Sequence, residues 1–222
     1  MTPSSRRGPE LPFAPFRLER LTPDARTAAV AVWVQGKMVG RVHEGAPPRL
    51  GLVPGAEVSA EAADALLAAL CARAAYESGL RRLARQAVAR GQLERRLAEV
   101  WGPDAARDAV AHLSPYLDDA AFARAWVERR LASRPMGAPA LLAGLCGRGV
   151  AEDVARPAIA EAIGDEDAFG LCQVAARRYL ARCDDPSPAR RRARLWAHLA
   201  RRGFDADTAE RVLARLGADG EW

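Results

Sequence analysis

Few residues in this chain could carry out chemistry, and they are widely spaced. Its 222 residues include 4 cysteines and 3 histidines, without a CxxC pair or the spacing of a zinc site. Asp118-Asp119 and Asp184-Asp185 are conspicuous carboxylate pairs, but helix capping is the simpler role for Asp118 and Asp119. The sequence also lacks the glycine signatures of phosphate-binding loops, dinucleotide-binding folds and serine hydrolases. We therefore expect no catalytic residue, no metal and no cofactor.

Arginine is the residue type that could form a binding surface. Lys37 is the only lysine among 33 basic residues, and the net charge is +5. The planar guanidinium suits phosphate and carboxylate, although the composition bias of a GC-rich genome also explains a shortage of lysine. The arginines lie on several helix faces, which are either solvated surfaces or a basic side that binds nucleic acid or an acidic protein. They are Arg81, Arg82, Arg85, Arg90, Arg95, Arg96, Arg124, Arg129, Arg130, Arg134, Arg177, Arg178, Arg182, Arg190, Arg191, Arg192 and Arg194.

The N-terminal quarter is predicted to contain a small antiparallel sheet of two or three strands, within residues 16–58. Residues 29–34 alternate in the period-two pattern of a strand, and residues 38–42 supply the returning strand. Gly36 can adopt the positive φ of a tight hairpin turn. The preceding residues, 1–15, are rich in proline and serine without any period, so we expect a disordered tail.

Everything after Ser59 has a helical pattern. Ser59 is a candidate N-cap for a helix that opens with the apolar run over residues 62–70; a helix is also expected over residues 74–90, with the first break at Gly91. Helix breaks then follow at glycine and proline positions, which gives helices of ordinary length.

A repeated pattern organises these helices. Leu141, Leu145, Gly149 and Val150 recur as Leu195, Leu199, Gly203 and Phe204, and Leu93, Leu97 and Trp101 form a weaker first copy. Gly149 and Gly203 suit the C′ position, where a helix ends in the left-handed conformation and the next apolar residue packs back beneath it. The sequence therefore predicts a mainly α fold: three tandem three-helix repeats in an elongated, curved array, preceded by the sheet. The repeats are expected at residues 59–115, 116–165 and 166–222.

Two nucleic-acid interpretations receive less support from the same pattern. A helix-turn-helix places basic or amide side chains at the start of its recognition helix, whereas these helices begin with acidic residues. The aromatic side chains that could stack bases fall at helical spacing, so we expect them in the core instead. They are Tyr116, Trp126, Tyr179 and Trp196, and Phe122, Trp126 and Leu131 are expected to form a buried stripe.

The stretch from Tyr116 to Arg130 resembles the central signature of the RecX regulatory proteins of bacteria. The residues that carry this resemblance are Asp118, Asp119, Phe122, Ala123, Trp126, Gly137, Leu141, Leu145, Arg148, Gly149 and Val150. Looser similarity extends over residues 16–216, and the family is described as three repeats of three helices. Gly144 departs from the pattern, which usually has Glu there, and as a poor helix residue it costs up to ~1 kcal/mol relative to Ala. Trp101-Gly102-Pro103 also replaces a short Lys-Gly turn.

This resemblance implies that the chain binds RecA, the recombinase that polymerises on single-stranded DNA, and lies in the groove of its filament. Filament extension, ATP hydrolysis and strand exchange would fall, which modulates recombination, repair and the SOS response. Weak non-specific DNA binding is a possible addition to this partner. A non-specific nucleic-acid-binding helical repeat protein, or a scaffold for another protein, remains an alternative. The residues expected to face the partner are Arg124, Arg129, Arg130, Arg148, Arg177, Arg178, Arg191 and Arg192.

The sequence also indicates where the protein works. Its longest apolar stretch, around residues 28–34, is far shorter than the ~20 residues that span a bilayer, and the N-terminus lacks a secretory signal. Scattered single cysteines suit a reducing compartment. We expect a cytoplasmic protein without a membrane partner that functions as a monomer.

Overall fold

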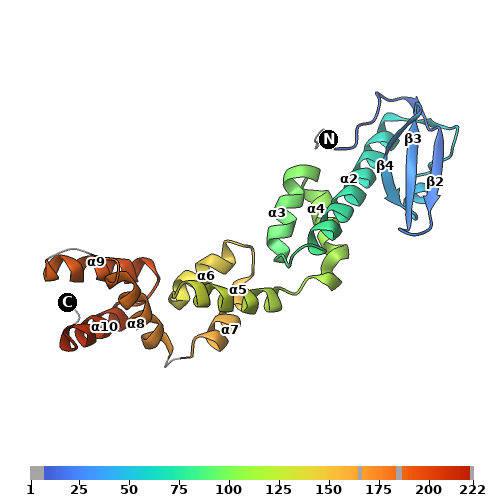
Figure 1. The fold of residues 1–222 in the computed structure, drawn as a ribbon. Coiled ribbons are helices and arrows are strands. Elements are labelled where there is room, and N and C mark those ends of the chain that lie inside the picture. The colour runs from blue at the N-terminus through green and yellow to red at the C-terminus, as the bar shows by residue number, and fades with distance from the viewer. Residues whose placement is uncertain (1–7, 165–166, 184–186, 221–222) are drawn as a thin grey trace. The chain divides into compact units, whose positions relative to one another are not determined.

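The computed structural model describes residues 8–164, 167–183 and 187–220. The chain divides into two compact units, Met1–Leu117 and Asp118–Trp222, whose elements are labelled in Figure 1. The fold is mainly helical with a small antiparallel sheet near the N-terminus, followed by three-helix groups, which confirms the predicted fold class. None of the helices within the described residues is long and apolar enough to cross a membrane.

The sheet of the first unit has the order β2-β3-β4, with antiparallel neighbours. Its central strand buries Val30, Val32 and Val34, as the alternating pattern predicted. Gln35 and Gly36 both have positive φ, at 51° and 74°, and close the predicted hairpin. A separate two-stranded pair joins β1 to β5. The strands are β1 (Phe16–Arg17), β2 (Arg20–Asp24), β3 (Ala29–Val34), β4 (Lys37–His43) and β5 (Glu57–Val58).

The longest helix of the first unit, α2 (Ala60–Leu83), is one continuous helix of 24 residues. The Ser59 hydroxyl accepts a hydrogen bond from Ala62 N at 3.3 Å, which confirms the predicted N-cap. The helix expected to run to residue 90 ends earlier, at Leu83, and the break expected at Gly91 falls inside α3 (Arg90–Trp101), because residues 84–89 already form the connection between the two helices. Position 79, in the interior of α2, requires glycine, because a Cβ there would collide with the Leu113 side chain.

Two apolar clusters stabilise this unit. In the first, Leu66 and Leu70 of α2 pack with the sheet residues Val32 and Val42. In the second, the far end of α2 packs with α3 and α4, and Leu93 and Leu113 are fully buried. Residues 8–15, part of the expected disordered tail, contribute Leu11 and Ala14 to the edge of the first cluster, whereas residues 1–7 lie outside the described residues. The short helices are α1 (Ala46–Arg49), α3 (Arg90–Trp101), α4 (Pro103–Leu113) and η1 (Ser114–Tyr116).

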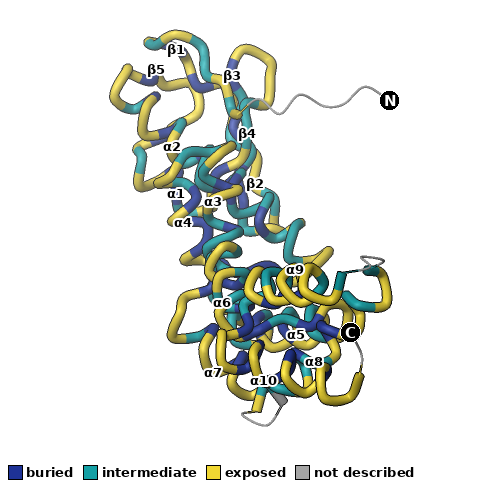
Figure 2. The backbone as a smooth tube through the Cα atoms, turned by 90° about the vertical axis from the view of Figure 1, so that its left-hand side faces the viewer, coloured by how far each residue is buried: buried dark blue, intermediate teal, exposed yellow. Residues whose placement is uncertain are grey.

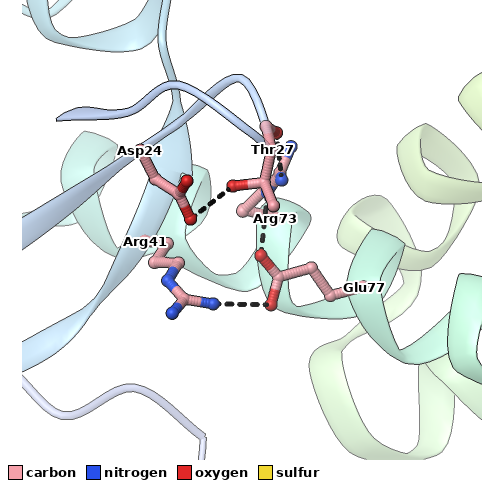
Figure 3. Close-up of polar contacts among 5 residues, drawn as sticks. All are labelled: Asp24, Thr27, Arg41, Arg73 and Glu77. Atoms are coloured by element: carbon pink, nitrogen blue, oxygen red, sulfur yellow. Dashed lines mark hydrogen bonds and ion pairs between the residues drawn. The ribbon is translucent and has the colours of Figure 1, made fainter.

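A polar network joins α2 to the sheet (Figure 3). The nearly buried Arg73 donates to the Glu77 carboxylate at 3.0 Å and to the Thr27 carbonyl at 2.7 Å. Glu77 also faces Arg41 of β4, at 3.9 Å. The Thr27 hydroxyl donates to Asp24, and this bond, followed by the Arg26 backbone N–H, lowers the pKa of Asp24. The buried arginine of this unit is therefore neutralised by a carboxylate.

The second unit contains two three-helix groups (Figure 1), and segments of their helices are buried (Figure 2). We name them repeat 2 and repeat 3. Repeat 2 consists of α5 (Asp119–Ser133), α6 (Ala138–Cys146) and α7 (Glu152–Ala162). Repeat 3 consists of α8 (Asp167–Leu180), α9 (Pro188–Arg201) and α10 (Ala206–Ala218). Asp118 caps α5, since its carboxylate accepts from Ala121 N at 2.8 Å, whereas Asp184 and Asp185 lie outside the described residues.

The repeated glycines end their helices as predicted. Gly149 and Gly203 have φ of 83° and 78°. The following residues donate back to the helix, Val150 N to Leu145 O at 3.1 Å and Phe204 N to Leu199 O at 3.2 Å. The side chains of Val150 and Phe204 are buried beneath the ending helices, as expected for this motif.

The aromatic residues differ from expectation. Tyr116 is 64% exposed and Trp196 40% exposed, so the prediction that both belong to the core was wrong. On α5, Phe122, Trp126 and Leu131 are only half-buried, because the fully buried line of this helix runs through the small residues Ala123 and Val127. Small side chains at the centre allow close helix packing and leave the rings at its borders.

Candidate functional site: an arginine-lined cleft in the second unit

Repeats 2 and 3 meet through two glycines. The amide of Gly137, at the start of α6, donates to the Arg202 carbonyl at 2.9 Å. A Cβ on Gly137 would collide with the Gly203 carbonyl, and a Cβ on Gly203 would lie 2.5 Å from that of Ala140. The backbones therefore touch, which only glycine at both positions permits.

Two arginines of repeat 3 reach across the same junction. Arg202 Nη1 donates to the Pro135 carbonyl at 3.1 Å, and Arg178 Nη1 donates to the Ser133 carbonyl at 3.3 Å. Both acceptors lie at or just beyond the C-terminal end of α5, where helix carbonyls lack partners within the helix. These bonds use only part of the donor capacity of each guanidinium, which has five N–H groups.

Beside this junction, a cleft of about 540 Å³ lies between the end of α5 and one face each of α8 and α9. Five of its lining side chains are arginines, and no carboxylate lines it among the residues that the structure describes. The remaining walls include the rings of Tyr179 and His198 and the Cys183 thiol. The arginines are Arg134, Arg178, Arg182, Arg194 and Arg202.

The positive charges in this cleft repel one another. Burial, and then the charges of Arg134, Arg130 and Arg178, lowers the pKa of Arg202. The guanidinium nevertheless remains charged at neutral pH. The arrangement is the opposite of the Arg73 network, where Glu77 supplies the counter-charge. Among the described residues that line the cleft, arginines outnumber carboxylates, and such a concentration of positive charge favours an anionic ligand.

His198 is part of the same field. Burial lowers the pKa of His198, and the charges of Arg202, Arg201 and Arg134 lower it further. Its ring lies against Tyr179, with centroids 4.6 Å apart and a 36° tilt. The imidazole therefore contributes a neutral ring surface to the cleft wall at pH 7.

A second arginine group surrounds Trp126 of α5. The guanidinium carbons of Arg148 and Arg130 lie 4.7 and 5.8 Å from the indole ring. Arg148 also donates to the Gly144 carbonyl at 2.8 Å, so it ties the end of α6 to α5. One side of α5 carries Trp126 and, four residues later, Arg130. Arg134, at the end of the helix, follows after four more residues and lines the cleft.

The structure separates the eight arginines that the sequence suggested. Arg178 lines the cleft, and the charge of Arg130 reaches it. Arg148 belongs to the Trp126 group. Arg124, Arg129 and Arg177 are exposed on other helix faces, Arg191 is half-buried on α9, and Arg192 pairs with Glu210 of α10 at 3.0 Å.

Sequence reasoning missed Arg202 and His198 as site residues. It named Arg134, Arg182 and Arg194 among the basic residues but did not include them in the partner-facing set. One signal was available: arginine precedes the terminal glycine in both strong copies, as Arg148 and Arg202. The two copies nevertheless act differently. Arg148 bonds within repeat 2, whereas Arg202 bonds to repeat 2 from repeat 3, and this difference depends on how the repeats pack.

Among the described residues, no cluster of histidine, cysteine and acidic side chains could hold a metal ion. The cleft contains a thiol, two rings and several guanidinium groups, a set suited to binding anions.

Two family models match the second unit. The model of the second three-helix domain of RecX matches residues 118–159, and that of the third three-helix domain of RecX matches residues 165–213. These spans include most of repeats 2 and 3 and the residues that line the cleft.

Curated relatives give the same result. The regulatory protein RecX of Thermus thermophilus is 36% identical over 144 residues, which cover 64% of this chain and 92% of that protein. The regulatory protein RecX of Thermobifida fusca is 40% identical over 105 residues, or 47% of this chain and 56% of the relative. That of Pelodictyon phaeoclathratiforme is 35% identical over 106 residues, or 46% and 64%. The chain thus matches less than two thirds of the length of these last two relatives.

Solved structures show the same fold. A crystal structure of regulatory protein RecX covers 89% of this chain and 98% of its own, with a TM-score of 0.66 and 20% identity. RecX from Lactobacillus salivarius covers 67% and 97%, with a TM-score of 0.56 and 17% identity. The fold and its arginine-rich junction define a helical-repeat protein. The chain belongs to the RecX family.

Proposed function

We propose that this protein is a negative regulator of RecA. It binds the RecA filament on single-stranded DNA and limits filament extension, ATP hydrolysis and strand exchange. Family membership supports this proposal, because the curated relatives are named as regulatory proteins. The observation that carries it is the arginine-lined cleft, which lies in the unit that both family models match.

Electrostatics explains how such a surface can act without catalytic groups. Single-stranded DNA carries a negative charge on each phosphate, and a basic patch on the regulator would raise its rate of association and orient it. Several repeats bound to one filament would then oppose its growth by occupying its surface. The attraction weakens as salt screens it.

Co-sedimentation with RecA filaments tests this proposal. The protein should pellet with RecA assembled on single-stranded DNA, and the ATPase rate of RecA should fall as the bound fraction rises. A protein that stays in the supernatant at low salt and leaves the ATPase rate unchanged would contradict the proposal and favour a scaffold role.

Charge reversal locates the contact. Reversing Arg130 would also disturb the Trp126 contact, because its guanidinium lies against that ring. Arg129→Glu combined with Arg134→Glu reverses two exposed charges on α5 and its end, and should weaken filament binding by at least tenfold. Arg156→Glu with Arg215→Glu reverses two exposed charges on α7 and α10 and serves as the matched control.

A non-specific nucleic-acid binder is the second candidate, favoured by the same cleft. In that case inhibition of any recombinase would follow competition for DNA. Affinity for bare single-stranded DNA would then equal the inhibitory potency at each salt concentration, with a steep salt dependence. Inhibition at protein concentrations far below those that coat the DNA would exclude this candidate.

A further inference from the structure

We propose that the cleft between α5, α8 and α9 is a binding site for phosphate groups of a nucleic-acid backbone. This inference deepens the proposed function, and it is tested without RecA so that the two can fail separately. Three observations support it: the convergence of guanidinium groups, the shape of the cleft and the continuation of positive charge beyond it.

The convergence of guanidinium groups favours phosphate over carboxylate. Arg134 comes from the end of α5, Arg182 from beyond α8 and Arg202 from the end of α9, so their donors approach from three elements. A tetrahedral phosphate directs its oxygens to several donors at once. A carboxylate has two coplanar oxygens and matches a single guanidinium fork.

The donors are held in place before any ligand arrives. Arg178 and Arg202 each anchor one Nη1 group on a carbonyl of repeat 2. Their remaining N–H groups stay available, and the anchoring bonds reduce the side-chain entropy that binding would cost. The cleft volume of about 540 Å³ lies within the range of small-ligand sites, ~300–1000 Å³. It can therefore hold a phosphate with an adjoining sugar or base.

The charge continues along α9, which favours a polymer over a single ion. Arg191, Arg194 and Arg201 share one side of the helix, with the neutral ring of His198 between the last two. A linear polyanion could follow this side from the cleft outward. An oligonucleotide should therefore bind more tightly than a free phosphate compound, because it reaches more of these groups.

The test compares two double variants of the full chain. Arg134→Gln with Arg182→Gln removes two exposed cleft charges that make no contact with the repeat 2 carbonyls. Arg156→Gln with Arg215→Gln removes two charges outside the cleft. Arg156 pairs with Glu152 on α7, and Arg215 of α10 pairs with Asp219 just after that helix. Circular dichroism verifies that both variants keep their helix content.

Two probes distinguish the source of the phosphate. Inorganic pyrophosphate is titrated calorimetrically, and a short labelled single-stranded oligodeoxythymidine is titrated by fluorescence anisotropy. The cleft variant should lose about tenfold or more in affinity for the oligonucleotide, and the control less than about twofold. The slope of log affinity against log salt should fall by about 1.4, at ~0.7 for each lost phosphate contact.

Equal losses in the two double variants would overturn the site, because net charge alone would then explain binding. Displacement of the oligonucleotide by polyglutamate at equal charge concentration would overturn the phosphate assignment in favour of an acidic protein segment. Cleft-dependent binding of pyrophosphate without binding of the oligonucleotide would overturn the polymer as the source.

Discussion

The Trp126 indole lies directly over Gly144, and a Cβ at residue 144 would come within 2.6 Å of its Cη2 atom. The sequence presents Gly144 only as a poor helix residue in place of the usual Glu. The structure gives the reason, because the ring occupies the space that any side chain would need. Arg148, which bonds to the Gly144 carbonyl and stacks on the same ring, completes this contact.

Gly144→Ala should therefore destabilise the second unit, although alanine is the better helix former. Overpacking against a rigid ring costs about 1–3 kcal/mol, which exceeds the ~1 kcal/mol gained in helix propensity. Chemical denaturation measures the change in unfolding free energy. In a Trp126→Leu background the same substitution should be neutral or stabilising, and an equal loss in both backgrounds would contradict the explanation.

Gly137→Ala should separate the backbones of repeats 2 and 3. Its Cβ would collide with the backbone of Gly203, which cannot move aside as a side chain can, so a loss of several kcal/mol is expected. Hydrogen exchange should rise at the start of α6. Gly170→Ala, in α8, is the matched control, because nothing lies within 4 Å of its added Cβ and it should stabilise by up to ~1 kcal/mol. A destabilising Gly170→Ala would show that helix glycines are needed generally.

The titration of His198 predicts a loss of stability in mild acid. Burial and the neighbouring arginines lower the pKa of His198 in the folded protein, so the unfolded chain takes up the proton first, near pH ~6.5. Stability should be unaffected above that pH and should fall as the pH drops from there toward the folded pKa. His198→Gln should remove this part of the pH dependence, as thermal melts between pH 5 and 8 would reveal. An unchanged profile would mean that other groups cause it.

Thiol alkylation should distinguish Cys172 from Cys146. Burial, with a smaller contribution from Asp205, raises the pKa of Cys172 to about 12. The thiolate that alkylating reagents require is therefore scarce at pH 8, and the residue is inaccessible. Mass spectrometry should find exposed Cys146 modified within minutes and Cys172 only after unfolding. Equal rates would indicate that α8 opens readily.

Glu77→Gln should weaken the first unit alone. Arg73 is nearly buried and would lose its carboxylate partner, at a cost of about 1–3 kcal/mol. Differential scanning calorimetry can follow the two units separately if they unfold at different temperatures. Glu61→Gln, on the exposed first turn of α2, is the control and should change stability by less than ~0.5 kcal/mol.

Local signals in the sequence were enough to predict much of this fold. The Gln35-Gly36 turn, the Ser59 cap and the terminal glycines 149 and 203 act through neighbouring residues, so their types and spacing reveal them. The exposure of Trp196 could not be predicted in this way. Its position on α9 has helical spacing, but whether another helix covers that side is decided by packing between elements.

The candidate site depends even more than the fold on packing between elements that are distant in the sequence. Arg178 was predicted from an arginine-rich helix, yet Arg134 and Arg202 became site residues only once repeats 2 and 3 were placed against each other. The cleft contains no local motif, because its walls come from segments up to about 70 residues apart, as the bond from Arg202 to Pro135 shows. Sequence composition indicates that a basic surface exists, and only the tertiary arrangement reveals where the charges converge.

Gly203 ends helix α9 and also touches the neighbouring repeat, so one residue serves local and long-range order together. If the end of α9 frays, the contact between Gly203 and Ala140 is lost. If repeat 3 detaches from repeat 2, that helix end becomes exposed to solvent. Repeats 2 and 3 should consequently unfold in a single cooperative transition, although each has its own apolar interior. The glycine that terminates α9 therefore also keeps repeats 2 and 3 rigidly packed against each other.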